Sequence, residues 1–245
     1  MKVLVFASRN TKEIIRDKFN LAFGLGFPII LLLLLTALQA NIPVSVFELN
    51  SLTPGIAIFG LSFISLFSGM LIAKDRESSL MLRLFTSPLR SSHFIFGYTI
   101  PLLPMSLVQI AVCFIVAVIL GLTFTFNIFL SIVVLIPAAL LFIGFGLLCG
   151  TIFTDKQVGG VCGALLTNVT AWLSGTWFDL DLIGGVFMKI SYVLPFYHAV
   201  ESGRAALNGN YSKIFPHLIW VIVYAVIVLG IAIIVFNKKM NSDKV

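Results

Sequence analysis

The sequence predicts an all-α integral membrane protein with six transmembrane helices. Of its 245 residues, 59% are hydrophobic and only 11% are charged, and the mean hydropathy is +1.09. Soluble domains carry about 25% charged residues, so a soluble globule of this size could not cover its surface with so few. Apolar runs of about 20 residues, the length that crosses a bilayer as a helix, recur along the chain. These observations exclude a soluble enzyme, a disordered protein and a disulfide-stapled secreted chain.

The apolar runs locate the spans. The third and fourth runs are longer than a bilayer requires and contain Pro101, Pro104 and Pro137, so we expect tilted or kinked helices there. The predicted spans are residues 21–40, 54–73, 94–120, 128–153, 158–177 and 216–236.

The basic residues orient these spans. Every Lys and Arg except Lys189, Arg204 and Lys213 falls in the N-terminal arm, in residues 74–93, in the link after the fourth span or in the tail. Cytoplasmic loops carry an excess of Lys and Arg, so we expect a multi-pass membrane protein with both termini cytoplasmic. The net charge of +6 therefore indicates membrane orientation rather than a nucleic-acid partner.

The N-terminal arm, residues 1–20, reads as an amphipathic helix that lies at the membrane surface. Val3, Ala7, Ile14 and Ile15 fall on or near one helical face, and Asn10 precedes Glu13 with the spacing of a capping box. The alternative is a plain basic flank of the first span with no separate role.

Residues 74–93 form a cytoplasmic segment between the second and third spans. Its apolar residues recur at helical spacing, and Pro88 ends the helix. Such a stripe lies either on lipid headgroups or in a groove of a soluble partner. The stripe consists of Leu80, Met81, Leu84 and Phe85.

Residues 178–215, on the outer side, are too apolar for a solvated loop, yet Lys189, Glu201 and Arg204 argue against a seventh span. Pro195 divides the region. We therefore expect two short outer helices, near residues 182–194 and 197–207.

Motifs for chemistry are missing from the sequence. It contains no phosphate-binding P-loop, no His-Glu-x-x-His zinc motif and no Gly-x-Ser-x-Gly nucleophile elbow. We therefore expect no catalytic residue, no metal ligand and no cofactor on this chain. The spans also lack ionisable residues at their centres, where ion-coupled transporters place them, so energy for transport would enter from elsewhere.

Mildly polar side chains do occur within the spans, and they have two interpretations. They either pack helices together through interhelical hydrogen bonds or line a substrate pathway. They are Gln109 in the third span and Thr167, Asn168, Thr170 and Ser174 in the fifth. Gly146 with Gly150, and Gly159 with Gly163, have the spacing of close helix contacts.

Two stretches carry motif-level similarity to a known family. Residues 76–88 are similar to the pattern R-E-x-G-T-L-E-x-L-L-x-T-P: Arg76, Glu77, Leu84 and Pro88 match, whereas Ser79, Leu80 and Leu82 depart from it. In residues 194–204, Pro195, Tyr197, Glu201 and Arg204 match the pattern that precedes the last span. With the order of spans and short helices, nearly the whole chain resembles the permease (transmembrane) subunit of ABC-2-type ATP-binding cassette transporters.

The resemblance implies a single transmembrane domain over residues 1–245. It also implies two permeases, identical or paralogous, and two separate ABC ATPase subunits that hold ATP and Mg. Residues 74–93 would be the coupling helix, with the apolar stripe and Pro88 on the ATPase and with Arg76, Glu77 and Arg83 as a polar rim. The exported substrate would be amphipathic: a drug, a peptide or lipopeptide antibiotic, or a lipid-like molecule, which associates the chain with multidrug or antibiotic resistance.

Other functions stay open at the level of sequence. Within the family, the substrate could be a polysaccharide or haem. From another class, an integral membrane lipid-modifying enzyme would need convergent acids, and Asp179 and Asp181 do not share a helix face. A non-catalytic immunity or sensor subunit on the same scaffold is a third alternative.

Overall fold

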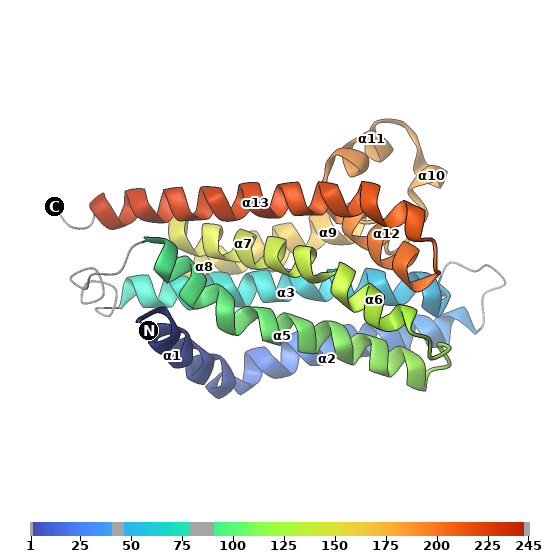
Figure 1. Ribbon diagram of the computed structural model, residues 1–245, viewed down its shortest axis with the longest axis horizontal. Coiled ribbons are helices and arrows are strands. Elements are labelled where there is room, and N and C mark those ends of the chain that lie inside the picture. Colours follow the sequence, from blue (N-terminus) through green and yellow to red (C-terminus); the bar gives the residue numbers. More distant parts are fainter. Residues whose placement is uncertain (1, 41–46, 79–90, 243–245) are drawn as a thin grey trace.

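The computed structural model describes residues 2–40, 47–78 and 91–242. Within these ranges the chain is helical apart from short connections and contains no strand. The helices form an elongated bundle, and both chain termini lie at the same end of it (Figure 1). We call this the termini end, and the opposite one, which carries residues 175–210, the far end.

Five helices in the described ranges are long and apolar enough to cross a membrane, and they coincide with five of the six predicted spans. The long helices are α2 (Lys18–Gln39), α3 (Leu49–Glu77), α5 (Ser91–Ile119), α6 with α7 (Asn127–Val134 and Ile136–Ile152) and α13 (Tyr211–Ser242). The N-terminal helix α1 (Lys2–Arg16) precedes them and bends into α2 at Asp17. Of the prolines expected to kink the spans, Pro137 accompanies the break between α6 and α7, whereas α5 continues through Pro101 and Pro104.

The predicted fifth span is not one long helix. It is made of α8 (Asp155–Val158), a π-helix η2 (Gly159–Leu166) and α9 (Thr167–Leu173). A capping box at Thr154 starts the segment, and the wide π turns fall where glycines are dense, because glycine weakens the preference for regular α-helix. Five of the six predicted transmembrane spans are therefore long apolar helices in the described ranges. A composite segment takes the place of the predicted fifth span.

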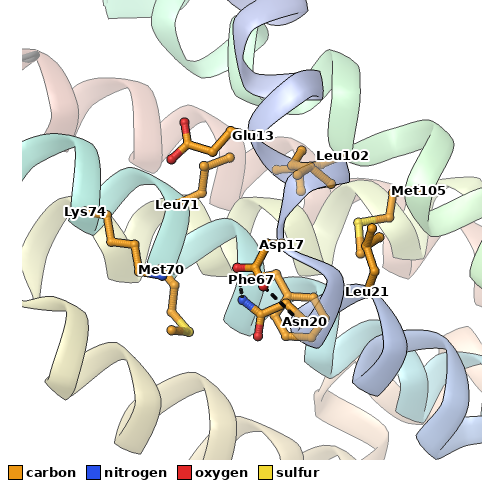
Figure 2. A pocket seen from close by; sticks show the side chains of 11 residues that line it. Glu13, Asp17, Asn20, Leu21, Phe67, Met70, Leu71, Lys74, Leu102 and Met105 are labelled. Atoms are coloured by element: carbon orange, nitrogen blue, oxygen red, sulfur yellow. Dashed lines mark hydrogen bonds between the residues drawn. The ribbon is translucent and has the colours of Figure 1, made fainter.

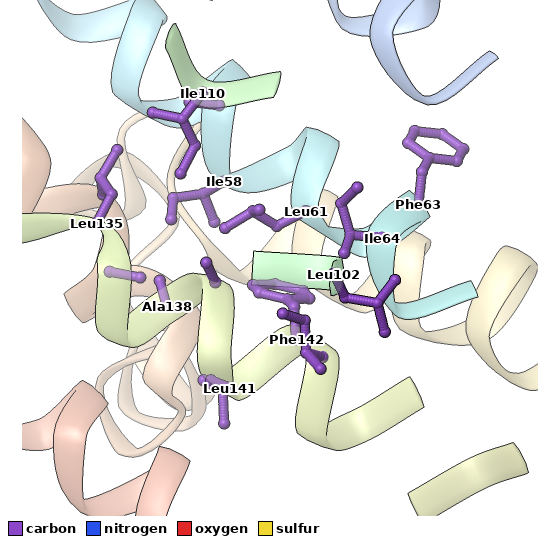
Figure 3. Packing of buried hydrophobic residues seen from close by; sticks show 14 of the residues in the cluster. Ile58, Leu61, Phe63, Ile64, Leu102, Ile110, Leu135, Ala138, Leu141 and Phe142 are labelled. Atoms are coloured by element: carbon purple, nitrogen blue, oxygen red, sulfur yellow. The ribbon is translucent and has the colours of Figure 1, made fainter. Parts of the chain in front are cut away.

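Helix α3 is the centre of the bundle. It is buried almost throughout and packs against α2, α5 and α7. Figure 3 shows Ile58, Leu61 and Ile64 of this helix in the same cluster as Leu102 of α5 and Phe142 of α7. The outer helices α2 and α13 leave most of their apolar side chains exposed or half-buried, as expected of surfaces that face lipid or another membrane subunit.

Glycines bring α3 and α7 into close contact. A methyl group at Gly146 would overlap the Ser65 carbonyl and the Ser68 hydroxyl, and one at Gly150 would overlap the Gly69 carbonyl. The packing interpretation of this pair is therefore confirmed, because only glycine permits the backbones to approach so closely. Gly159, in contrast, has open space around it.

Three short helices, rather than the two predicted, follow α9 at the far end. They are α10 (Leu180–Ile183), α11 (Gly185–Val193) and α12 (Pro195–Leu207). The first predicted helix is divided at Gly184 and Gly185, whose φ angles of +63° and +61° are incompatible with a continuing right-handed helix. Pro195 begins α12, as the sequence predicts.

Candidate functional site

The candidate site is the termini end of the bundle, where α3 ends and α5 begins. The predicted coupling stripe and its neighbours lie outside the described residues: Leu80, Met81, Arg83, Leu84, Phe85 and Pro88. The two stems that carry this segment are described, however, and their contacts show how the segment is attached.

Asp75, in the last turn of α3, holds three helices together. Its carboxylate accepts hydrogen bonds from both terminal nitrogens of Arg9 of α1, at 2.5 and 2.7 Å, and from the Tyr98 hydroxyl of α5, at 2.7 Å. Asp75 is only 3% exposed, and a buried carboxylate requires such partners because its desolvation is costly. We call Arg9, Asp75 and Tyr98 the carboxylate cluster.

The electrostatics of the carboxylate cluster are dominated by Asp75. Burial lowers the pKa of the Arg9 guanidinium, but its hydrogen bonds and charge interaction with Asp75 raise the pKa overall. Glu13 also pairs with Arg9, at 2.5 Å, yet burial and repulsion by Asp75 raise the pKa of the Glu13 carboxyl. The positive charge of Arg9 is thus shared between two carboxylates, of which Asp75 is the more deeply buried.

Arg76 and Glu77, two of the predicted rim residues, attach α3 to the connection between α7 and α8. Arg76 donates to the Gly150 carbonyl at 2.7 Å and to the Phe153 carbonyl at 3.3 Å. The Asp155 N–H donates to a carboxylate oxygen of Glu77 at 3.1 Å. These bonds are made within the chain, and a contact of the same side chains with an ATPase stays a prediction.

The face of helix α1 that packs against α5 differs in part from the apolar face that the sequence predicts. Phe6 lies edge-on to Phe94 and Tyr98, with ring centroids 5.6 and 5.0 Å apart. Asn10 is buried and donates to the Gly97 carbonyl at 3.1 Å, so it is not the helix cap that its spacing to Glu13 predicted. Ile15, expected on the apolar face, is exposed.

At the far end, Arg204 of the predicted outer motif joins three segments. Its guanidinium donates to the Ser51 and Gly175 carbonyls, both at 2.9 Å, and to Glu201 at 2.8 Å. Tyr197 donates to the Tyr192 hydroxyl at 3.3 Å. Tyr197, Glu201 and Arg204, together with Asp179 and Asp181, line a cavity of about 500 Å³. Pro195 contributes by starting α12.

The family model described as ABC-2 type transporter matches residues 1–208 of the chain. The chain belongs to this family. A search of curated proteins found no significant match. Family membership makes the chain the membrane component of an ABC transport system and implies an ABC ATPase as its partner. The five long apolar helices agree with a multi-pass membrane protein.

In this ABC-2 family member, four of the five polar span residues are buried in the bundle and one is exposed. Gln109 reaches from α5 to α3, where its amide lies 3.4 Å from the Ala57 carbonyl, which is the geometry of helix packing. Thr167, Thr170 and Ser174 are buried, and Thr167 and Ser174 have partners at 3.0 Å and 2.7 Å. Asn168 alone of the five is exposed on the surface of the bundle.

A small cavity lies beside the carboxylate cluster, at the bend between α1 and α2. Figure 2 shows Glu13 and Lys74 at this pocket, with Phe67 and Leu71 among its apolar side chains. The cavity holds about 50 Å³, enough for one or two water molecules. Asp17 stabilises the bend by accepting from the Asn20 N–H at 3.1 Å. Within the described ranges, no group of three or more His, Cys, Asp or Glu residues lies together as metal ligands do.

The carboxylate cluster was not predicted from the sequence. Arg9 and Asp75 are 66 positions apart, and Tyr98 is 23 positions beyond Asp75. Asp75 stands in a run of charged residues that resembles an ordinary cytoplasmic flank, so its type and position gave no signal that it is buried.

Proposed function

We propose that the chain is the permease subunit of an ATP-driven exporter in the bacterial cytoplasmic membrane. A separate ABC ATPase subunit supplies the energy and docks on residues 74–93. The observation that best supports this proposal is the attachment of both stems of that segment to the bundle through Asp75. The termini end is then cytoplasmic, as the distribution of Lys and Arg predicts.

The contacts at the stems provide a route for mechanical work. Asp75 lies two residues before α3 ends, and Tyr98 lies in the second turn of α5. Arg9 of α1 binds the same carboxylate. A force applied to the segment that joins α3 to α5 therefore moves α1, α3 and α5 as one unit. Arg76 and Glu77 extend that unit to the α7–α8 connection. Closure of ATPase subunits on bound ATP and Mg would deliver the push.

The exported substrate, in this proposal, is amphipathic and passes between two permease copies, identical or paralogous. Asn168 supports a pathway along the composite segment, because it is a polar side chain exposed on an otherwise apolar surface. Such a surface suits a molecule with both polar and apolar parts, such as a drug, a lipopeptide or a lipid.

The decisive test places a charge on the predicted ATPase-binding stripe. Leu84→Glu should abolish co-purification with the partner ATPase and the stimulation of its activity by substrate, with a loss of more than about tenfold, because a buried hot-spot contact contributes about 2 kcal/mol or more. Thr86→Glu, off the stripe of the same predicted helix, is the matched control and should retain both properties.

Two results would overturn the proposal. One is normal coupling in Leu84→Glu and in a second stripe variant, Phe85→Glu. The other is transport against a gradient by the purified chain in liposomes without any ATPase. Size-exclusion chromatography of each variant distinguishes lost docking from lost folding.

A further inference from the structure

Two histidines from different helices meet at the far end. The Nδ1 atoms of His198 in α12 and His217 in α13 are 2.8 Å apart, and the Nε2 atom of His198 is 2.8 Å from the Tyr192 carbonyl oxygen in α11. Both distances are those of hydrogen bonds. One imidazole pair thus links three helices.

The arrangement of donors and acceptors limits the charge that this pair can carry. A carbonyl oxygen only accepts, so His198 carries a proton on Nε2. The Nδ1–Nδ1 contact then needs one proton between its two nitrogens, which the pair has when it is neutral and when it bears one positive charge. When both rings are protonated, neither Nδ1 is an acceptor and two like charges face each other, so the contact must break.

The surroundings also act on the charge of the pair. Burial lowers the pKa of His198, while the Tyr192 carbonyl and Glu201 act in the opposite direction. Glu201 of α12 and Lys213 of α13 are the charged side chains that act on His217. Trp220 stacks on the His198 ring, with centroids 5.2 Å apart. The remaining titratable neighbours are Tyr192 and Tyr197.

Side chains of α12 and α13 bind two backbone carbonyls at the end of α11, and one of these side chains is a histidine. His198 binds the Tyr192 carbonyl, and the Tyr224 hydroxyl of α13 donates to the Val193 carbonyl at 2.8 Å. The pKa of His198 is lowered in the folded chain, so its contribution to stability is complete above the ordinary histidine pKa of about 6.5 and is lost as the pH falls through the lowered value.

We propose that the contact between His198 and His217 is a proton-operated latch, which holds α12 against α13 at neutral pH and releases α12 from α13 in acid, while the Tyr192 carbonyl of α11 stays bound to His198. The geometry of the pair carries this inference, and it does not depend on the assignment of an ATPase or a substrate. It predicts that the far end responds to the acidity of the compartment it faces.

Hydrogen exchange of the full chain in lipid nanodiscs tests the latch. We compare peptides covering Pro195–Leu207 at about pH 7.5 and about pH 5, on either side of the ordinary histidine pKa, with times corrected for intrinsic exchange. The wild-type chain should exchange severalfold faster in acid, because the open state becomes more populated. His217→Gln cannot take the second charge, so it should remain closed at both values. His93→Gln, at the termini end, should behave as the wild type does.

The proposal is overturned if wild-type exchange in α12 is independent of pH, or if His217→Gln opens in acid as the wild type does. His217→Asn, which also lacks a titrating ring, replaces His217→Gln if that variant does not give a monodisperse peak on size exclusion. An acid response lost in these variants but retained in His93→Gln supports the latch.

Discussion

The two ends of the bundle hold their peripheral segments by different chemistry. At the termini end, Asp75 binds the guanidinium of Arg9 and the hydroxyl of Tyr98. At the far end, the histidine latch holds α12 against α13, and the Tyr224 hydroxyl binds the Val193 carbonyl of α11. An arginine stays charged at any physiological pH, whereas histidine titrates near neutrality. The comparison indicates a permanent attachment at the end where we propose that force enters and a releasable one at the opposite end.

The largest expected effect comes from breaking the carboxylate cluster. Arg9→Gln leaves Asp75 buried without its cation, so the free energy of unfolding should fall by about 2–3 kcal/mol, less than for a fully buried pair because Arg9 is partly exposed. The double variant Arg9→Gln/Asp75→Asn should recover at least half of the loss. Denaturant unfolding of the solubilised chain measures both. A double variant no more stable than the single one would contradict a buried uncompensated charge as the cause.

An intermediate effect is expected at Arg204 of the far end. Arg204→Lys keeps the charge but replaces a planar fork by a point charge, which cannot reach Ser51, Gly175 and Glu201 together. Loss of these hydrogen bonds should lower the free energy of unfolding by about 1–2 kcal/mol. Lys213→Arg, an exposed change that also keeps the charge, is the control and should leave unfolding unchanged. Equal stability of Arg204→Lys and wild type would show that the ion pair with Glu201 suffices.

The smallest effects compare one tyrosine hydroxyl at each end. Tyr98→Phe removes a buried bond to Asp75 and should reduce the free energy of unfolding by about 1 kcal/mol or more. Tyr224→Phe removes a bond at an exposed position, where water replaces it, and should cost less than about 0.5 kcal/mol. The same unfolding assay ranks the two variants. A larger loss in Tyr224→Phe would reverse the proposed order of rigidity of the two ends.

Some of the site was accessible from sequence because it depends on local patterns. Arg204 and Glu201 were singled out within one motif, and they pair at i, i+3 on one helix face. Pro195 correctly predicted the start of α12. The glycine spacing at Gly146 and Gly150 indicated close helix packing, which the contact with α3 confirms.

Contacts between distant segments were not accessible in this way. His198 and His217 lie on separate helices 19 positions apart, and no helical or strand period relates them. The same holds for Arg9 and Asp75. The position of Asn10 on α1 illustrates the limit, because a local capping pattern was present and the packing of α1 against α5 overrode it.

By itself, the sequence determined that this chain is helical and where its apolar runs lie, and it predicts which side of the membrane its basic residues favour. These properties follow from hydropathy and charge summed along the chain, since each long apolar helix satisfies its own backbone hydrogen bonds in lipid. Only the tertiary structure decided that α3 is central, that the fifth segment is composite, and which polar side chains meet. Those outcomes depend on how helices with similar apolar surfaces pack, and a buried charge or imidazole is stable only where another helix supplies its partner.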